Sequence, residues 1–275
     1  MLKARVITAV FLTIGFLAAL FLASKMVWTL LTLAVTLIGV WEWSKLIKLH
    51  KQEMHIYVGL ALVIGLLLAL TVDTRFALYH DEIAFSLLSL STLFWVVFSP
   101  IWLISRKKIN YKLLMAFLGL VLLLATWVAL TGLQNISPWL LLGVLATVWL
   151  ADSAAYFVGK RFGRHKLAPE ISPGKTWEGV AGAMLAATVY GLVLCHYMHY
   201  SRWLILGLWL IVVLSIMGDL FESLLKRQAG VKDSSHLLPG HGGVLDRIDG
   251  LIPTLPLVLF YIYFPLFSNL QLHAR

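Results

Sequence analysis

Apolar residues occur along the chain in nine long runs, and short polar segments separate these runs. The hydrocarbon core of a bilayer is about 30 Å thick, so a helix that crosses it needs about 20 largely apolar residues. We predict one transmembrane helix in each run, at residues 6–24, 26–47, 55–72, 83–104, 113–131, 137–157, 179–200, 203–222 and 251–267. The pattern therefore predicts an all-α polytopic integral membrane protein with about nine transmembrane helices.

The composition excludes other classes of protein. Hydrophobic residues make up 60% of the chain and charged residues 13%, whereas a soluble domain contains roughly 25% charged residues. A mean hydropathy of +0.89 excludes a disordered chain, and the lone cysteine, Cys195, excludes a disulfide scaffold. The first run follows a short basic segment, as signal peptides do. Its apolar core is long for one and no clean cleavage site follows, so we expect it to remain as a helix.

The net charge of +9 reflects where the basic residues lie. If the N-terminus is placed in the cytoplasm, 18 of the 22 Lys and Arg residues fall in cytoplasmic segments. Cytoplasmic loops of membrane proteins are enriched in Lys and Arg. We therefore predict a multi-pass protein of a bacterial-type inner membrane, with the N-terminus in the cytoplasm and the C-terminus outside. This asymmetry explains most of the charge, so no nucleic-acid partner is expected.

The acidic residues divide the chain into two regions. Eight of the 13 Asp and Glu residues lie between Asp152 and Asp249, in cytoplasmic segments or in the helix ends beside them. We therefore predict an N-terminal transmembrane scaffold at 1–135 and a C-terminal transmembrane catalytic region at 136–275. The polar site is expected at the cytoplasmic face of the second region.

The first polar segment of the second region surrounds Asp152, in or near the end of the sixth predicted helix. A carboxylate there is costly unless it faces a polar cavity, a partner or a metal ion. Asp152, Tyr156 and Gly159 have helical spacing and can share one face, and a basic loop begins at Lys160. We favour a functional carboxylate, and a buried Asp that pairs with a lysine is the alternative.

The second polar segment, from Ser172 to Glu178, is expected to open the seventh predicted helix. Its Gly-Lys-Thr sequence resembles the end of a phosphate-binding loop. The first glycine of that motif would fall at Pro169, and no strand is predicted before it, so this is not a Walker motif. A helix start with free N–H groups and Lys175 still suits an anion. A plain helix cap explains the same residues equally well.

The third polar segment is the richest in chemistry. One helical face carries four polar side chains, those of Asp219, Glu222, Ser223 and Lys226. Asp246 and Asp249 follow, after a loop rich in Gly and Pro. Hard oxygen ligands in this number suit Mg²⁺ far better than zinc, and the basic residues among them indicate a site for phosphate and metal. A salt-bridged cytoplasmic loop is the alternative.

The segment also carries a long motif. Residues 223 to 249 read S-x2-K-R-x4-K-D-x-S-x2-L-P-x-H-G-G-x2-D-R-x-D. This motif resembles the signature of the phosphatidate cytidylyltransferases, or CDP-diacylglycerol synthases. The resemblance implies that CTP and phosphatidic acid react to give CDP-diacylglycerol and pyrophosphate, with Mg²⁺ and a second metal ion, at a membrane-embedded site open to the cytoplasm. The first five predicted helices resemble that family only in being apolar, and no residue role is transferred to them.

The resemblance, together with the chemistry of the side chains, leads to hypotheses for individual roles. We expect the metal to be held by Asp219, Asp246 and Asp249. We expect catalytic roles, mainly the neutralisation and orientation of phosphates, for Ser223, Lys226, Arg227, Lys232, Asp233, His241 and Arg247. We expect substrate-binding roles, including a second ion or the ribose for the two carboxylates, for Asp152, Lys160, Ser172, Lys175, Thr176 and Glu178.

Other functions remain as alternatives. A CTP-dependent lipid kinase would use the γ-phosphate of CTP. A transporter is disfavoured because the charges lie at one face and not at the bilayer midplane. A CDP-alcohol phosphotransferase is disfavoured because its wider Asp spacing is absent, and a structural membrane protein would not need so many clustered carboxylates and bases. A homodimer is the default expectation for the assembly.

Overall fold

The computed structural model describes residues 13–71, 77–237 and 242–264, and this part of the chain is almost entirely helical. Seven apolar helical segments within it are long enough to cross a membrane. They are α2 (Lys25–Leu46), α3 (Lys51–Thr71), the joined segment of α4 (Ala77–Leu93), η1 (Phe94–Phe98) and α5 (Ser99–Ser105), α6 (Lys112–Ile136), α7 (Pro138–Phe162), α8 (Trp177–Met198) and α9 (Leu204–Ala229). The all-α membrane architecture is therefore confirmed.

The predicted count of about nine spans is matched only in part. The first and last predicted runs correspond to the shorter apolar helices Thr13–Leu22 and α11 (Leu251–Tyr263) within the described ranges. The fourth run is one continuous segment in which the π-helical turn η1 joins α4 to α5. Pro100 lies in the first turn of α5, where its missing N–H removes a helical hydrogen bond, and a local π-helical turn accommodates such a loss.

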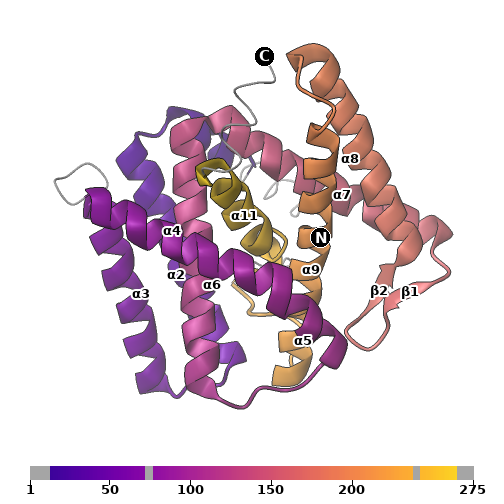
Figure 1. Ribbon diagram of the computed structural model, residues 1–275. Coiled ribbons are helices and arrows are strands. Elements are labelled where there is room, and N and C mark those ends of the chain that lie inside the picture. The colour runs from indigo at the N-terminus through magenta and orange to yellow at the C-terminus, as the bar shows by residue number, and fades with distance from the viewer. Residues whose placement is uncertain (1–12, 72–76, 238–241, 265–275) are drawn as a thin grey trace.

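Helix α6 lies in the middle of the bundle and packs against α2, α4, α7 and α11, as Figure 1 shows. It is apolar on all sides, as expected for a helix surrounded by other helices. The pair α7 and α8 packs closely together beside α9. Helix α9 contacts α7, α8 and α11 of the second half of the chain and α2 and α5 of the first half.

An aromatic cluster fixes α9 against the first half of the chain. The Phe221 ring lies on α9, with its centroid 5.2–6.3 Å from the ring centroids of Trp43, Phe94, Trp95 and Trp102. Aromatic pairs at such distances add roughly 0.5–1.5 kcal/mol each beyond the area they bury. Phe221 therefore anchors the turn of α9 that carries Asp219, Glu222 and Ser223.

A two-stranded hairpin between α7 and α8 was not predicted. Strands β1 (Lys166–Ala168) and β2 (Ser172–Thr176) are antiparallel, and Lys166 pairs with Thr176. Ser172 and Lys175 therefore lie in a strand, and our expectation that they open a helix is wrong. Helix α8 begins after Thr176, whose Oγ1 accepts a hydrogen bond of 3.1 Å from the Gly179 N–H. Figure 1 shows that the tip of the hairpin points towards α5 and α9, and Ile171 at that tip is buried.

Candidate active site

Two groups of carboxylates and lysines meet along the last turns of α9. We call the first the Lys226 group; it contains Glu222, Lys226, Ser234 and Asp246. Lys226 Nζ lies 2.5 Å from Glu222 Oε2 and 2.5 Å from Asp246 Oδ1. Glu222 and Lys226 are four positions apart along α9, so the contact confirms that these side chains share a helical face.

The Asp246 carboxylate is held by the loop that precedes it. Its Oδ2 accepts hydrogen bonds from the Ser234 N–H (3.0 Å), the Ser234 hydroxyl (2.9 Å) and the Gly243 N–H (2.8 Å). Burial raises the pKa of Asp246, but the hydrogen bonds from Lys226, Gly243 and Ser234 outweigh it and lower the pKa to about 2. Asp246 is therefore an ionised carboxylate with its partners already in place.

The second set, which we call the Lys175 group, contains Asp152, Lys175, Asp219 and Asp249. Lys175 Nζ lies 2.6 Å from Asp219 Oδ2, and Ser223 donates a hydrogen bond of 3.2 Å to Asp219 Oδ1. Asp152 interacts electrostatically with Lys175 and Asp219. Burial, and then the charge of Asp219, raise the pKa of Asp249 to about 8. One lysine thus faces three carboxylates that come from α7, α9 and the turn before α11.

Close backbone packing brings Asp249 to α9. A Cβ atom on Gly218 would lie 2.2 Å from the Asp249 carbonyl oxygen and 2.8 Å from the Pro253 ring. Because Gly218 has no side chain, the turn at Asp249 can rest directly on the helix next to Asp219. This contact explains why Asp219 and Asp249, which are 30 positions apart in the sequence, repel each other electrostatically.

The predicted metal ligands divide between the two groups. Asp219 and Asp249 belong to the Lys175 group, whereas Asp246 belongs to the Lys226 group. Within the described part of the chain, no three acidic, His or Cys side chains are already arranged to hold a metal ion. Mg²⁺ does not require such a cage, because it commonly binds one or two carboxylates together with water and substrate phosphates. The crowded oxygen donors of the Lys175 group, which repel one another, suit that ion chemically.

The other predicted site residues lie around these groups. Arg227 Nε donates to the Ile171 carbonyl at 3.4 Å and joins α9 to the hairpin. Glu178 accepts from the His165 N–H and contacts His165 Nδ1 at 2.7 Å, so it holds the loop after α7. Lys160 lies near the Tyr156 hydroxyl at 3.5 Å. Lys232, Asp233 and Arg247 are exposed, and His241 lies outside the described residues.

One buried carboxylate was missed by the sequence analysis, which assigned the first half of the chain to scaffold. Glu42 of α2 is 0% exposed, and its oxygens accept hydrogen bonds from residues of the same loop that holds Asp246. An acidic residue inside an apolar run is a signal that could have identified it, because such a residue requires a polar partner.

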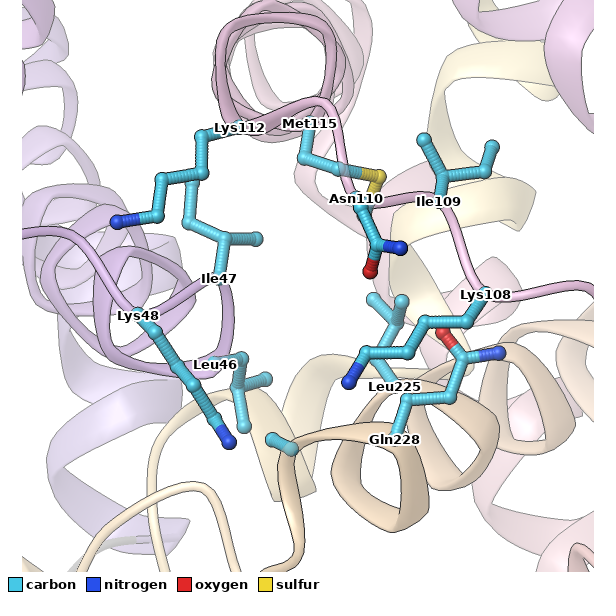
Figure 2. A pocket seen from close by; sticks show the side chains of 11 residues that line it. Leu46, Ile47, Lys48, Lys108, Ile109, Asn110, Lys112, Met115, Leu225 and Gln228 are labelled. Atoms are coloured by element: carbon cyan, nitrogen blue, oxygen red, sulfur yellow. The ribbon is translucent and has the colours of Figure 1, made fainter.

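A cavity of about 150 Å³ lies beside these groups but does not include them. It opens between the ends of α2, α6 and α9, and Figure 2 shows Lys48, Lys108 and Lys112 around apolar side chains such as Leu225. None of its lining residues is a predicted site residue. We therefore place the candidate active site at the Lys175 and Lys226 groups, where the charged chemistry is concentrated.

Comparison with known proteins identifies the family of this chain. Residues 3–265 match the Cytidylyltransferase family. This chain belongs to the cytidylyltransferase family. It is 36% identical to the phosphatidate cytidylyltransferase of Haemophilus influenzae over 97% of this chain and 100% of that protein. It is 39% identical to that of Pseudomonas aeruginosa over 93% and 95%, and 34% identical to that of Bacillus subtilis over 95% and 97%.

Family membership makes the chain a membrane-bound nucleotidyltransferase. The resemblance that rested on residues 223 to 249 is confirmed, and it extends over nearly the whole chain. The first half, for which no motif had been found, is therefore part of the same cytidylyltransferase architecture.

Proposed function

We propose that this cytidylyltransferase transfers the cytidylyl group of CTP to the phosphate of phosphatidic acid and releases pyrophosphate. The observation that carries the proposal is the convergence of the Lys175 and Lys226 groups at one end of a membrane-spanning bundle. Relatives named phosphatidate cytidylyltransferase match over nearly their full length and support the choice of substrates.

The chemistry requires little proton transfer. A phosphate monoester has a second pKa near 6, so the lipid phosphate is largely dianionic at neutral pH. One of its oxygens attacks the α-phosphorus of CTP, the bond from that phosphorus to the β-phosphate bridge breaks, and pyrophosphate leaves with the bonding electrons. No strong general base is needed, and the main barrier is the repulsion between two polyanions.

The lysines of the site suit the task of neutralising that charge. Lys226 Nζ contacts two carboxylates, and the Lys226 side chain is 12% exposed. Lys175 lies on the hairpin, between the polar end of α9 and Asp152. We assign the phosphates of CTP and of the lipid to these two lysines, with Arg227, Lys232 and Arg247 as further basic residues around them.

Mg²⁺ fits the Lys175 group, and we propose that Asp219 and Asp249 hold it with Asp152 nearby. Such an ion neutralises the α-phosphate and the departing pyrophosphate when bound. Asp246, on the neighbouring group, is our proposal for the ligand of a second ion. At the Lys175 group, an ion held beside Asp219 would leave Lys175 available for phosphate oxygens.

The membrane supplies the second substrate. We propose that the protein lies in a bacterial inner membrane with its N-terminus in the cytoplasm and its C-terminus outside, so that the site lies at the headgroup level. The basic segments near the ends of α2, α7 and α9 belong to that same side. A positive surface there attracts both anionic substrates. A homodimer is also proposed, because twofold dimers are the commonest form of homo-oligomer among soluble proteins.

One assay tests the function. Purified protein receives Mg²⁺, phosphatidic acid and CTP labelled at the α-phosphate, and we expect label in the lipid and release of pyrophosphate. Label that stays in CDP, together with γ-phosphate transfer to a lipid alcohol, would instead identify a CTP-dependent lipid kinase. Solute uptake into sealed vesicles without CTP would identify a transporter and overturn the proposal.

A further inference from the structure

We infer that Glu42, from the first half of the chain, is a positioning residue that fixes the loop around Asp246 and so aligns the Lys226 group. The inference rests on the proposed function, because alignment matters only if Asp246 and Lys226 act on phosphates or on a metal ion. It assigns part of the site to α2, which lies outside the region where the acidic residues are concentrated.

The Glu42 carboxylate is fully buried and fully satisfied. Its Oε1 accepts hydrogen bonds from the Ser235 hydroxyl at 2.5 Å and the Val244 N–H at 3.0 Å. Its Oε2 accepts from the Leu245 N–H at 2.7 Å and lies 3.2 Å from the Ser234 hydroxyl, whose single proton it shares with Asp246. A carboxylate offers about four acceptor positions, and each Glu42 oxygen therefore has two partners.

The same contacts connect Glu42 to the reacting groups. The Ser234 hydroxyl lies between Glu42 Oε2 and Asp246 Oδ2, at 3.2 Å and 2.9 Å. The Leu245 N–H, held by Glu42, belongs to the residue next to Asp246. Asp246 in turn contacts Lys226 at 2.5 Å. A displacement of Glu42 would therefore reach Asp246 through both a side chain and the backbone.

The packing around Glu42 leaves little freedom to the loop. A Cβ atom on Gly243 would lie 2.0 Å from Ser234 Oγ and 2.4 Å from Glu42 Oε1. An apolar side chain in place of Glu42 would leave the Val244 and Leu245 N–H groups without an acceptor, so the carboxylate both stabilises the loop and fixes its backbone. The carboxylate fixes the positions of the Val244 and Leu245 N–H groups and of the Ser234 and Ser235 hydroxyls, because hydrogen bonds are directional.

The substitution Glu42→Gln is the sharpest test. It keeps the shape, but the amide nitrogen brings donors where the loop also presents donors, so at most half of the four hydrogen bonds survive. Loss of a group that orients a catalytic or metal-binding residue typically costs about 10- to 100-fold in activity. We expect a fall of that size in kcat for transfer from CTP to phosphatidic acid, with partial recovery in Glu42→Asp.

A matched control and a substrate-free measurement accompany it. Glu53 is an exposed carboxylate that accepts a hydrogen bond from the His50 N–H at the start of α3, and Glu53→Gln is expected to leave kcat unchanged. Hydrogen exchange, followed by mass spectrometry without substrates, is expected to be faster at residues 243–245 in Glu42→Gln and unchanged in Glu53→Gln. If Glu42→Gln fails to fold, Ser235→Ala removes one of the four bonds and should give a smaller change in the same direction.

The outcomes separate the two proposals. Faster exchange at residues 243–245 together with a lower kcat supports the positioning role. Unchanged exchange overturns that role whatever the activity, because the measurement needs neither CTP nor lipid. Faster exchange with an unchanged kcat overturns it as well. A wild-type protein that transfers no cytidylyl group overturns the proposed function alone.

Discussion

The two lysine–carboxylate groups on α9 differ in how completely their carboxylates are paired. In the Lys226 group, Asp246 has a lysine and three hydrogen bonds from the loop, and its pKa is lowered to about 2. In the Lys175 group, one lysine faces three carboxylates, and the pKa of Asp249 is raised to about 8, first by burial and then by Asp219.

This difference indicates that the two groups contribute to phosphate chemistry in different ways. A satisfied group is rigid before substrate arrives, and such preorganisation lowers the barrier for reactions that develop charge. A group with excess negative charge is unfavourable until a cation joins it. The Lys226 group is therefore preorganised before substrate binds, whereas the Lys175 group requires a bound cation to balance its charge.

The largest expected effect comes from removing a carboxylate of either group. Asp219→Ala or Asp246→Ala should reduce CDP-diacylglycerol formation to a background level, a loss of about 100- to 1,000-fold or more, since each removes charge stabilisation at the reacting phosphates. Transfer of label from α-labelled CTP to lipid measures this. The amount of protein in the membrane fraction should stay unchanged, and retained activity in either variant would contradict the metal assignment.

Removing Lys226 should have the largest effect on stability. Glu222 and Asp246 would both be left without their cation, with side chains only 5% and 10% exposed. Breaking a buried pair in this way costs about 3–5 kcal/mol. We expect Lys226→Ala to lower the free energy of unfolding by about that amount, measured by thermal unfolding in detergent. The double variant Lys226→Ala, Glu222→Gln should recover part of the loss, and no recovery would contradict the pairing.

The sign of a stability change distinguishes the two groups. Above pH 8, where Asp249 is ionised, Asp249→Asn removes a negative charge that burial and Asp219 both disfavour. Without Mg²⁺ it should therefore raise the stability by about 1 kcal/mol, or roughly 2–4 °C. Asp246→Asn weakens the contact with Lys226 and should lower the free energy of unfolding. Parallel melting curves with and without Mg²⁺ measure both. A fall in both variants would show that the two groups are not as different as their contacts indicate.

The sequence predicted what depends on local spacing. The shared face of Glu222 and Lys226 follows from the four-residue period of a helix, and the structure confirms it. The membrane-spanning helices follow from apolar runs, although seven reach full length among the residues that the structure describes. These features depend on residues that are close together in the sequence, so the spacing of polar and apolar residues is sufficient to predict them.

What escaped prediction depends on contacts between distant segments. The pairing of Lys175 with Asp219 requires the hairpin, and strands of three and five residues, one of them with Pro173, carry no alternating pattern. The contact of Glu42 with Ser234 joins residues 192 positions apart. Nothing local distinguishes Glu42 as part of the site, apart from its charge within an apolar run.

The smallest predicted effect decides between the two interpretations of Thr176. Its hydroxyl accepts the Gly179 N–H and is buried at the start of α8, as expected for a helix cap. Loss of such a cap costs about 1 kcal/mol. If Thr176 only caps α8, Thr176→Ala lowers the unfolding temperature by a few degrees while the KM for CTP stays constant, and Thr176→Ser restores the stability. A raised KM for CTP at unchanged stability would instead place Thr176 among the phosphate-binding residues, and would extend the Lys175 group to the start of α8.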